Sequence, residues 1–341
     1  MNLPDYNFIS APLWLITVLH ILTLTLHFIA MNFLLGGIII VLLAKLKDKW
    51  NDPTIQKFVK MFPNAMAATV TIGVAPLLFV QLVFHRQIYA ASIISGWFWL
   101  MIILAVIIGY YFLYASSFSK KTPGNKPVYL SLALICLLYV SFVYSSVFSM
   151  AERPEFFKSL YAANQSGFVL NPDLNSYIFR WLHMVLGAVT VGGFFVGLLG
   201  RNNPPAFSIG KKFFLYGTLG NALVGFIYLF TLGDILVPFM RSPGIWFLTV
   251  GIVLAFGTLH FFFKRRFVIA TSMLSVSMLT MVISRHFVRL IKLGAFFEPA
   301  SLPVRPQWSI FFVFLIAFVA ALATVWYMLK LFFDNGRAAA E

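Results

Sequence analysis

Nine long apolar segments constrain this chain more than any other feature of its sequence. They cover residues 13–44, 62–84, 94–118, 127–150, 177–200, 211–240, 244–263, 267–292 and 308–333. Each is close to or above the ~20 residues that a helix needs to cross the hydrocarbon core of a bilayer. Because 61% of the 341 residues are hydrophobic and only 10% are charged, a soluble domain could not bury this apolar surface. The sequence therefore predicts an all-α polytopic membrane protein with about nine transmembrane helices, in one domain covering residues 1–341.

Basic residues are concentrated in alternate connectors between these segments. Most of the 25 Lys and Arg residues lie in connectors 45–60, 119–126, 200–212 and 263–266 or in the C-terminal tail. By the positive-inside rule these connectors are cytoplasmic, which predicts an outside N-terminus and a cytoplasmic C-terminus in a bacterial inner membrane. This orientation explains the net charge of +15 without a nucleic-acid partner. The first segment is longer than the core of a signal peptide, so we expect it to be retained as a helix.

Five of the six histidines fall in the predicted outer half of the membrane. They are His20, His27, His85, His183 and His286, whereas His260 is close to a cytoplasmic basic connector. Ionisable side chains are costly within a bilayer, and neutral imidazole is a common axial ligand of haem iron in helix bundles. A single histidine of this kind is more often a hydrogen-bonded interior residue. Five at matched depth on four segments favour a bundle that holds b-type haems.

Arginines accompany these histidines. Arg180 and Arg289 each lie three residues from a histidine, and therefore on the same helix face, while Arg86 is adjacent to one. Because the guanidinium group forms bidentate bonds with carboxylates, we expect these three arginines to bind haem propionates.

Four stretches of the sequence resemble a known family. They are His27-Phe28 followed by Gly36, then Gly73-Val74-Ala75, then Leu170-Asn171-Pro172 with Phe179, His183-Met184-Val185 and Val191, and finally His286-Phe287-Val288-Arg289. The pattern is similar to subunit I of the cytochrome bd quinol oxidases, closely over residues 13–200 and loosely beyond. The resemblance implies nine spans, with His27 as a ligand of the oxygen-reducing haem pair and His183 as a ligand of the low-spin haem. His286 occupies the position of a glutamate that ligates a high-spin haem in the family.

The sequence departs from the family at positions whose family residues take part in oxygen reduction. Gln81 stands where the family has a carboxylate, and His286 replaces the glutamate ligand. The quinol-binding loop shrinks to residues 237–244, and Thr249 takes the place of a methionine ligand. Among ten acidic residues, only Asp234 falls inside a predicted span. Because oxygen reduction needs an open coordination position and a proton supply through buried acids, these departures favour electron transfer.

The sequence thus predicts a b-type cytochrome subunit with two or three haems in the outer half of the membrane. It would pass electrons between the membrane and a periplasmic c-type cytochrome, multihaem forms included, together with other membrane subunits. No Cys-x-x-Cys-His motif occurs and Cys136 is the one cysteine, so a c-type haem would belong to another subunit. We expect His286 to be the counterpart of His27, and His85 is a candidate partner of His183. His20 would ligate an additional haem or only form a hydrogen bond, and quinone binding stays open.

Two other functions remain compatible with the sequence. The first is a terminal reductase of oxygen or another small molecule, fed by cytochrome c or quinol. The second is a transporter or membrane scaffold, although transporters usually place broken helices and polar clusters at the midplane. Asp234 would be a proton carrier or quinol base in a reductase; otherwise it would pair with Arg241, two helical turns away.

Overall fold

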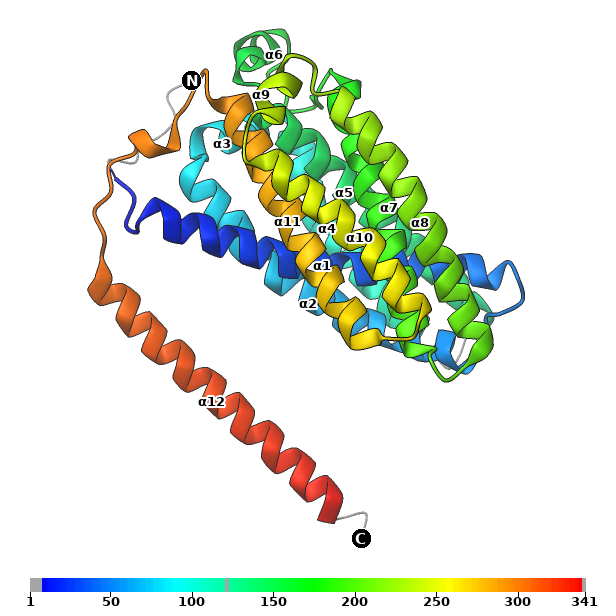
Figure 1. Cartoon of the computed structure of the whole chain (residues 1–341). Coiled ribbons are helices and arrows are strands. Elements are labelled where there is room, and N and C mark those ends of the chain that lie inside the picture. The colour runs from blue at the N-terminus through cyan, green and yellow to red at the C-terminus, as the bar shows by residue number, and fades with distance from the viewer. Residues whose placement is uncertain (1–7, 120–122, 339–341) are drawn as a thin grey trace.

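The computed structural model describes residues 8–119 and 123–338, and the regular structure of these residues is helical (Figure 1). The α-helices are α1 (Leu13–Lys45), α2 (Pro53–Val83), α3 (His85–Ile94), α4 (Gly96–Phe118), α5 (Lys126–Ala151), α6 (Phe157–Ala163), α7 (Leu174–Leu199), α8 (Pro204–Phe230), α9 (Leu236–Met240), α10 (Gly244–Phe263), α11 (Phe267–Leu293) and α12 (Trp308–Ala338). Short 3-10 turns lie at Pro123–Asn125, Pro154–Phe156, Gly233–Ile235 and Pro299–Ser301.

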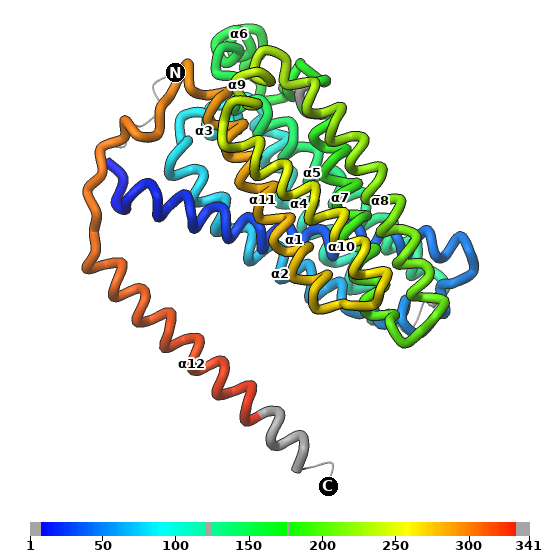
Figure 2. The backbone as a smooth tube through the Cα atoms, in the orientation of Figure 1, coloured from blue at the N-terminus to red at the C-terminus, as the bar shows by residue number. Residues whose placement is uncertain are grey.

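Nine of the described helices are long and apolar enough to cross a membrane. They are α1, α2, α4, α5, α7, α8, α10, α11 and α12. The prediction of an all-α, multi-pass membrane protein is therefore confirmed. The first eight form a bundle in which α1 packs on α2 and α7, α4 on α5, α7 on α8, and α10 on α11. Helix α12 lies apart from the bundle in Figures 1 and 2, and none of its side chains between residues 308 and 331 is buried.

Helix α2 begins nine residues before its apolar segment. Asp52 caps its N-terminus by accepting hydrogen bonds from the backbone N–H groups of Thr54 (2.8 Å) and Ile55 (3.3 Å), and Pro53 occupies the first helical position. The Asn203 side-chain amide also donates to Asp52 (3.0 Å), which joins the start of α2 to the start of α8. The helix end is therefore set by polar capping rather than by hydropathy.

The predicted sixth span, residues 211–240, is wrong at its C-terminal end. Helix α8 ends at Phe230, and Gly233 has a φ of +55°, a left-handed conformation that breaks the helix. Asp234 consequently lies in an exposed 3-10 turn outside the spans, so its predicted place inside a span is also wrong. The end of α2 also differs from the prediction, because the chain bends at Phe84 and His85 begins the separate helix α3.

Glycines let α1, α7 and α8 approach at backbone distance. A Cβ atom placed on Gly36 of α1 would lie 1.7 Å from the Ala188 carbonyl oxygen of α7. One on Gly210 of α8 would lie 2.2 Å from the Gly197 nitrogen of α7. Small residues are the usual means of close helix packing in membranes, where dispersion contacts replace the hydrophobic effect as the driving force. Helix α7 is therefore fixed between α1 and α8 by backbone contacts.

Replacing Gly36 tests this packing. We expect Gly36→Ala to reduce the free energy of unfolding by about 1–3 kcal/mol, because the added methyl group meets backbone atoms that cannot rotate away. Unfolding of the detergent-solubilised protein by a denaturing detergent measures this loss.

Gly220→Ala is the matched control on α8. Its Cβ would meet only a Leu186 methyl group at 3.9 Å, so the variant should be neutral or slightly stabilised. Equal stability of the two variants would contradict the proposed backbone contact between α1 and α7.

Candidate functional site

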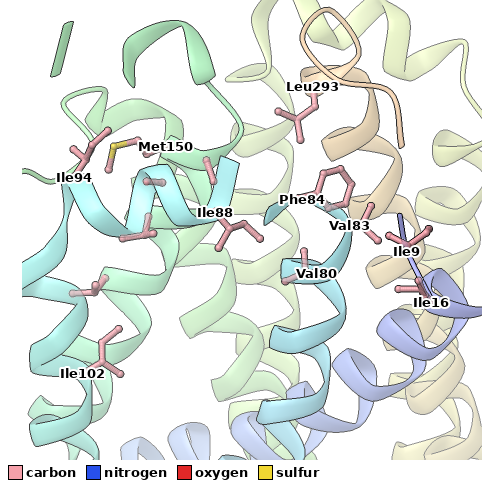
Figure 3. Packing of buried hydrophobic residues seen from close by; sticks show 14 residues of the cluster. Ile9, Ile16, Val80, Val83, Phe84, Ile88, Ile94, Ile102, Met150 and Leu293 are labelled. Atoms are coloured by element: carbon pink, nitrogen blue, oxygen red, sulfur yellow. The ribbon is translucent and has the colours of Figure 1, made fainter. Parts of the chain in front are cut away.

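Many helix ends meet at one end of the bundle, which we call the Glu152 end. They include the C-terminal ends of α2, α5, α8 and α11 and the N-terminal ends of α1, α4 and α7. Figure 3 shows the apolar packing here, with Ile16 of α1 near Val83 of α2 and Met150 and Leu293 at the ends of α5 and α11. A group of charged side chains adjoins this packing, since Glu152 is two residues after Met150 and Lys292 directly precedes Leu293.

Glu152 is the centre of that group, and its residue is only 3% exposed. One carboxylate oxygen, Oε1, pairs with Arg285 and lies 3.7 Å from Arg289 Nε and 3.9 Å from Arg180 Nη1. The other, Oε2, lies 3.5 Å from Lys292 Nζ. One carboxylate from the end of α5 therefore contacts four cations from α7 and α11.

The charges in this group do not balance. Four cations face one carboxylate, a formal charge of +3, and Glu152 is the one acid within 4.0 Å of them in the described residues. Several buried polar atoms also lack a hydrogen-bond partner within the described part of the chain. They are Arg285 Nε and Nη1, Glu152 Oε2 and Tyr228 Oη. Arg285 Nε and Nη1 are donors, Glu152 Oε2 is an acceptor and Tyr228 Oη can be either, so this group has unused hydrogen-bonding capacity where buried polar groups are normally paired.

The ionisation of Glu152 follows from its neighbours. Burial alone would raise the pKa of this carboxyl, but the charges of Arg285, Lys292, Arg180 and Arg289 outweigh it and hold the pKa well below its ordinary range. Glu152 is therefore a fixed negative charge at neutral pH. It does not suit proton transfer, since a carboxylate held by four cations is a poor base.

His27 and His183 are held in the same way on different helix pairs. His27 of α1 donates its Nδ1–H to the Thr69 carbonyl oxygen of α2 at 3.0 Å. His183 of α7 donates its Nδ1–H to the Asn221 carbonyl oxygen of α8 at 3.1 Å. In each case the residue four positions beyond the acceptor is a glycine facing the ring: a Cβ on Gly73 would lie 2.7 Å from His27, and one on Gly225 would lie 2.9 Å from His183.

This geometry determines the tautomer of both rings. A carbonyl oxygen only accepts hydrogen bonds, so the proton lies on Nδ1 and a neutral ring keeps the lone pair of Nε2 for another partner. Metal-bound histidines usually donate their second ring N–H to a carbonyl or carboxylate in this manner. His27 and His183 are thus prepared to present Nε2 as a ligand.

His20 and His286 line one cavity at the Glu152 end. The cavity has a volume of about 540 Å³, lies between α1, α2, α11 and residues 294–300, and has largely apolar walls. His20 donates Nδ1–H to the Pro76 carbonyl oxygen at 3.0 Å, and Arg289 Nη1 donates to its Nε2 at 3.4 Å. Nδ1 of His286 has no hydrogen-bond partner in the described residues. We expected His286 to face His27, but the cavity instead combines it with His20.

The remaining predicted residues lie nearby on α2 and α3. His85 is buried, and this burial lowers the pKa of its imidazole, so the ring is neutral at pH 7. Arg86 is exposed and Gln81 is half-buried. Among the described residues, no group of three or more His, Cys, Asp or Glu side chains is arranged to hold a metal ion.

Sequence reasoning missed Glu152. The residue directly follows the fourth apolar segment, in a connector that also contains Arg153 and Glu155. Its one distinctive signal was its position at a span end, opposite the four basic residues that two other spans place at the same depth. Comparisons with protein families, curated proteins and solved structures find no match to this chain.

Removing the Glu152 charge should destabilise the protein strongly. We expect Glu152→Gln to lower the free energy of unfolding by about 3–5 kcal/mol, because four partly or fully buried cations lose their counter-charge. Denaturing-detergent titration followed by circular dichroism measures the change.

Glu155→Gln makes the same chemical change in the same connector. Glu155 is 39% exposed and pairs with Arg153 at 3.3 Å, so its loss should cost at most about 1 kcal/mol. Equal effects of the two substitutions would contradict a central role of Glu152 in stability.

Proposed function

We propose that this chain is a membrane b-type cytochrome subunit and a divergent relative of cytochrome bd subunit I. It carries electrons between the membrane and a periplasmic c-type cytochrome, through two or three haems in the outer half of the membrane. The lysine-rich connectors at the opposite end would face the cytoplasm, which places the Glu152 end outside. The subunit would reside in a bacterial inner membrane together with other membrane subunits.

The observation that carries this proposal is the matched setting of His27 and His183. Both rings are anchored through Nδ1 to a backbone carbonyl, and both lie against a glycine of the next helix. Any neutral histidine that donates Nδ1–H has an unprotonated Nε2, so the distinguishing observation is that the same carbonyl-and-glycine setting occurs twice, on two different helix pairs. An anchored Nδ1–H with an available Nε2 lone pair is what an axial haem ligand requires.

The residues present also fit the haem group itself. A porphyrin supplies the equatorial ligands of its iron, so the protein adds only axial ones and needs no cluster of three ligands. Its propionates require cations at the membrane edge, and Arg180 and Arg289 lie within one turn of His183 and His286. Bound haem b supplies one-electron chemistry; the chain orients the group, excludes water and sets its electrostatic surroundings.

Electron transfer is favoured over oxygen reduction by the placement of acids. When the span of α12 is taken as Trp308–Leu331, no acidic residue falls within the nine apolar spans, and Asp334 lies in the part of α12 that follows. The buried carboxylate of Glu152 is held by four cations, and Asp234 is exposed in a turn. A route that delivers protons to a reducing site needs titratable groups along its path, and the described spans hold no carboxylate for one.

The cavity beside His20 and His286 supports a second candidate function. Its volume of about 540 Å³ is within the range of small-molecule sites, and its walls carry two imidazoles. A reductase of oxygen or another small molecule, fed by cytochrome c or quinol, would use such a space. Oxygen consumption with a chemical reductant, together with high-spin haem signals, would favour this function over an electron carrier.

Haem content tests the main proposal. The purified protein should give a pyridine haemochrome spectrum of haem b with two or three equivalents per chain. His27→Ala and His183→Ala should each lose about one equivalent, because each removes an axial ligand.

His260→Ala is the control, since this exposed histidine lies at the opposite end of the bundle, at the end of α10. It should keep the full haem content. A wild-type protein without haem b, or three variants with the same content as the wild type, would refute the proposal.

A further inference from the structure

The charged group at the Glu152 end joins the surroundings of two histidine sites. On one side, Arg180 lies one helical turn before His183 on α7 and donates to Ser149 Oγ at 3.1 Å. On the other side, Arg289 of α11 contacts His20 Nε2 at 3.4 Å. Both guanidinium groups point toward the same Glu152 oxygen. The charged group therefore lies beside both histidine sites and contacts residues next to each of them.

The surplus positive charge and the unpaired Arg285 donors of this group suit carboxylate ligands. Its formal charge of +3 would be neutralised by acidic ligands, and the orphaned Nε and Nη1 of Arg285 point along different edges of the guanidinium, so each can donate to a separate carboxylate oxygen. The side chain of Arg289 is only 8% exposed and that of Lys292 is 13% exposed, so bulk solvent supplies little compensation. A buried surplus of this size is costly unless anions share the site.

From this arrangement we infer that Glu152 is the positioning residue of one shared carboxylate-binding site that receives propionates from two haems. Arg180 serves the haem held by His183, Arg289 serves a haem in the cavity beside His20 and His286, and Arg285 and Lys292 lie between them. Glu152 holds the four cations at one place and leaves enough positive charge to bind the propionates. This inference rests on the proposed function, because it requires bound haem.

The charge of Glu152 should then act on both haems. A reduced haem carries one more negative charge than an oxidised one, so a nearby anion disfavours reduction and a nearby cation favours it. Removing the Glu152 charge should therefore raise the midpoint potentials of both haems. Removing the Lys292 charge should lower them, and this variant leaves Glu152 with three cations.

The experiment is a spectroelectrochemical redox titration of the purified, haem-loaded wild type and of three variants. We expect positive shifts for Glu152→Gln, negative shifts for Lys292→Gln and no shift for Glu155→Gln, whose carboxylate is half-exposed outside the group. Pyridine haemochrome content is recorded for each sample. Lys292→Gln keeps the test decisive if Glu152→Gln does not fold, because it changes the same group while preserving the central carboxylate.

The outcomes separate the two proposals. The shared site is supported if Glu152→Gln raises the midpoint potentials of two haems and Lys292→Gln lowers the potentials of the same two haems. Shifts confined to one haem, or variants with the potentials of the wild type, overturn the shared site while the haem proposal stands. A wild-type protein without haem b overturns both.

Discussion

The burial of one carboxylate among four cations organises the end of the bundle where the candidate site lies. Glu152 extends from the end of α5, whereas its partners belong to α7 and α11, so the ion pairs tie three helices together. An ion pair in an apolar interior seldom repays its desolvation, and excess cations make the balance worse. Such an arrangement is expected where charge serves binding, since a purely structural contact at these helix ends could be apolar. Stability and ligand binding would therefore draw on the same residues.

The histidines depend on a second constraint, the close approach of helix backbones. His27 is anchored to α2 and His183 to α8, which makes two rigid helix pairs. These pairs are joined where Gly36 of α1 meets the Ala188 carbonyl of α7. Small residues at helix contacts thus do two things: they allow tight packing, and they create the space that each imidazole ring occupies beside a neighbouring helix. The distance between His27 and His183 is consequently fixed by the backbone contact between α1 and α7.

Much of this fold could be predicted from the sequence, but the centre of the site could not. Hydropathy located the nine spans, because a bilayer imposes a minimum apolar length on each one. It failed at Gly233, where a local backbone conformation ends α8 and leaves Asp234 outside. His27 and His183 were singled out as candidates by depth and by the family resemblance, yet their carbonyl partners depend on helix rotation. Glu152 was missed because its four cations come together only through tertiary packing.

Rigid anchoring also bears on which chemistry the bundle suits. An electron carrier benefits from ligands whose positions barely change with oxidation state, whereas a transporter needs helices that break or slide to alternate access. Here each anchored imidazole sits between two packed helices, and the buried charges gather at the Glu152 end. The apolar spans of the described residues, with α12 taken to Leu331, contain histidines as titratable groups but no carboxylate. The features that fix the histidines are therefore the ones on which the proposed electron-transfer function rests.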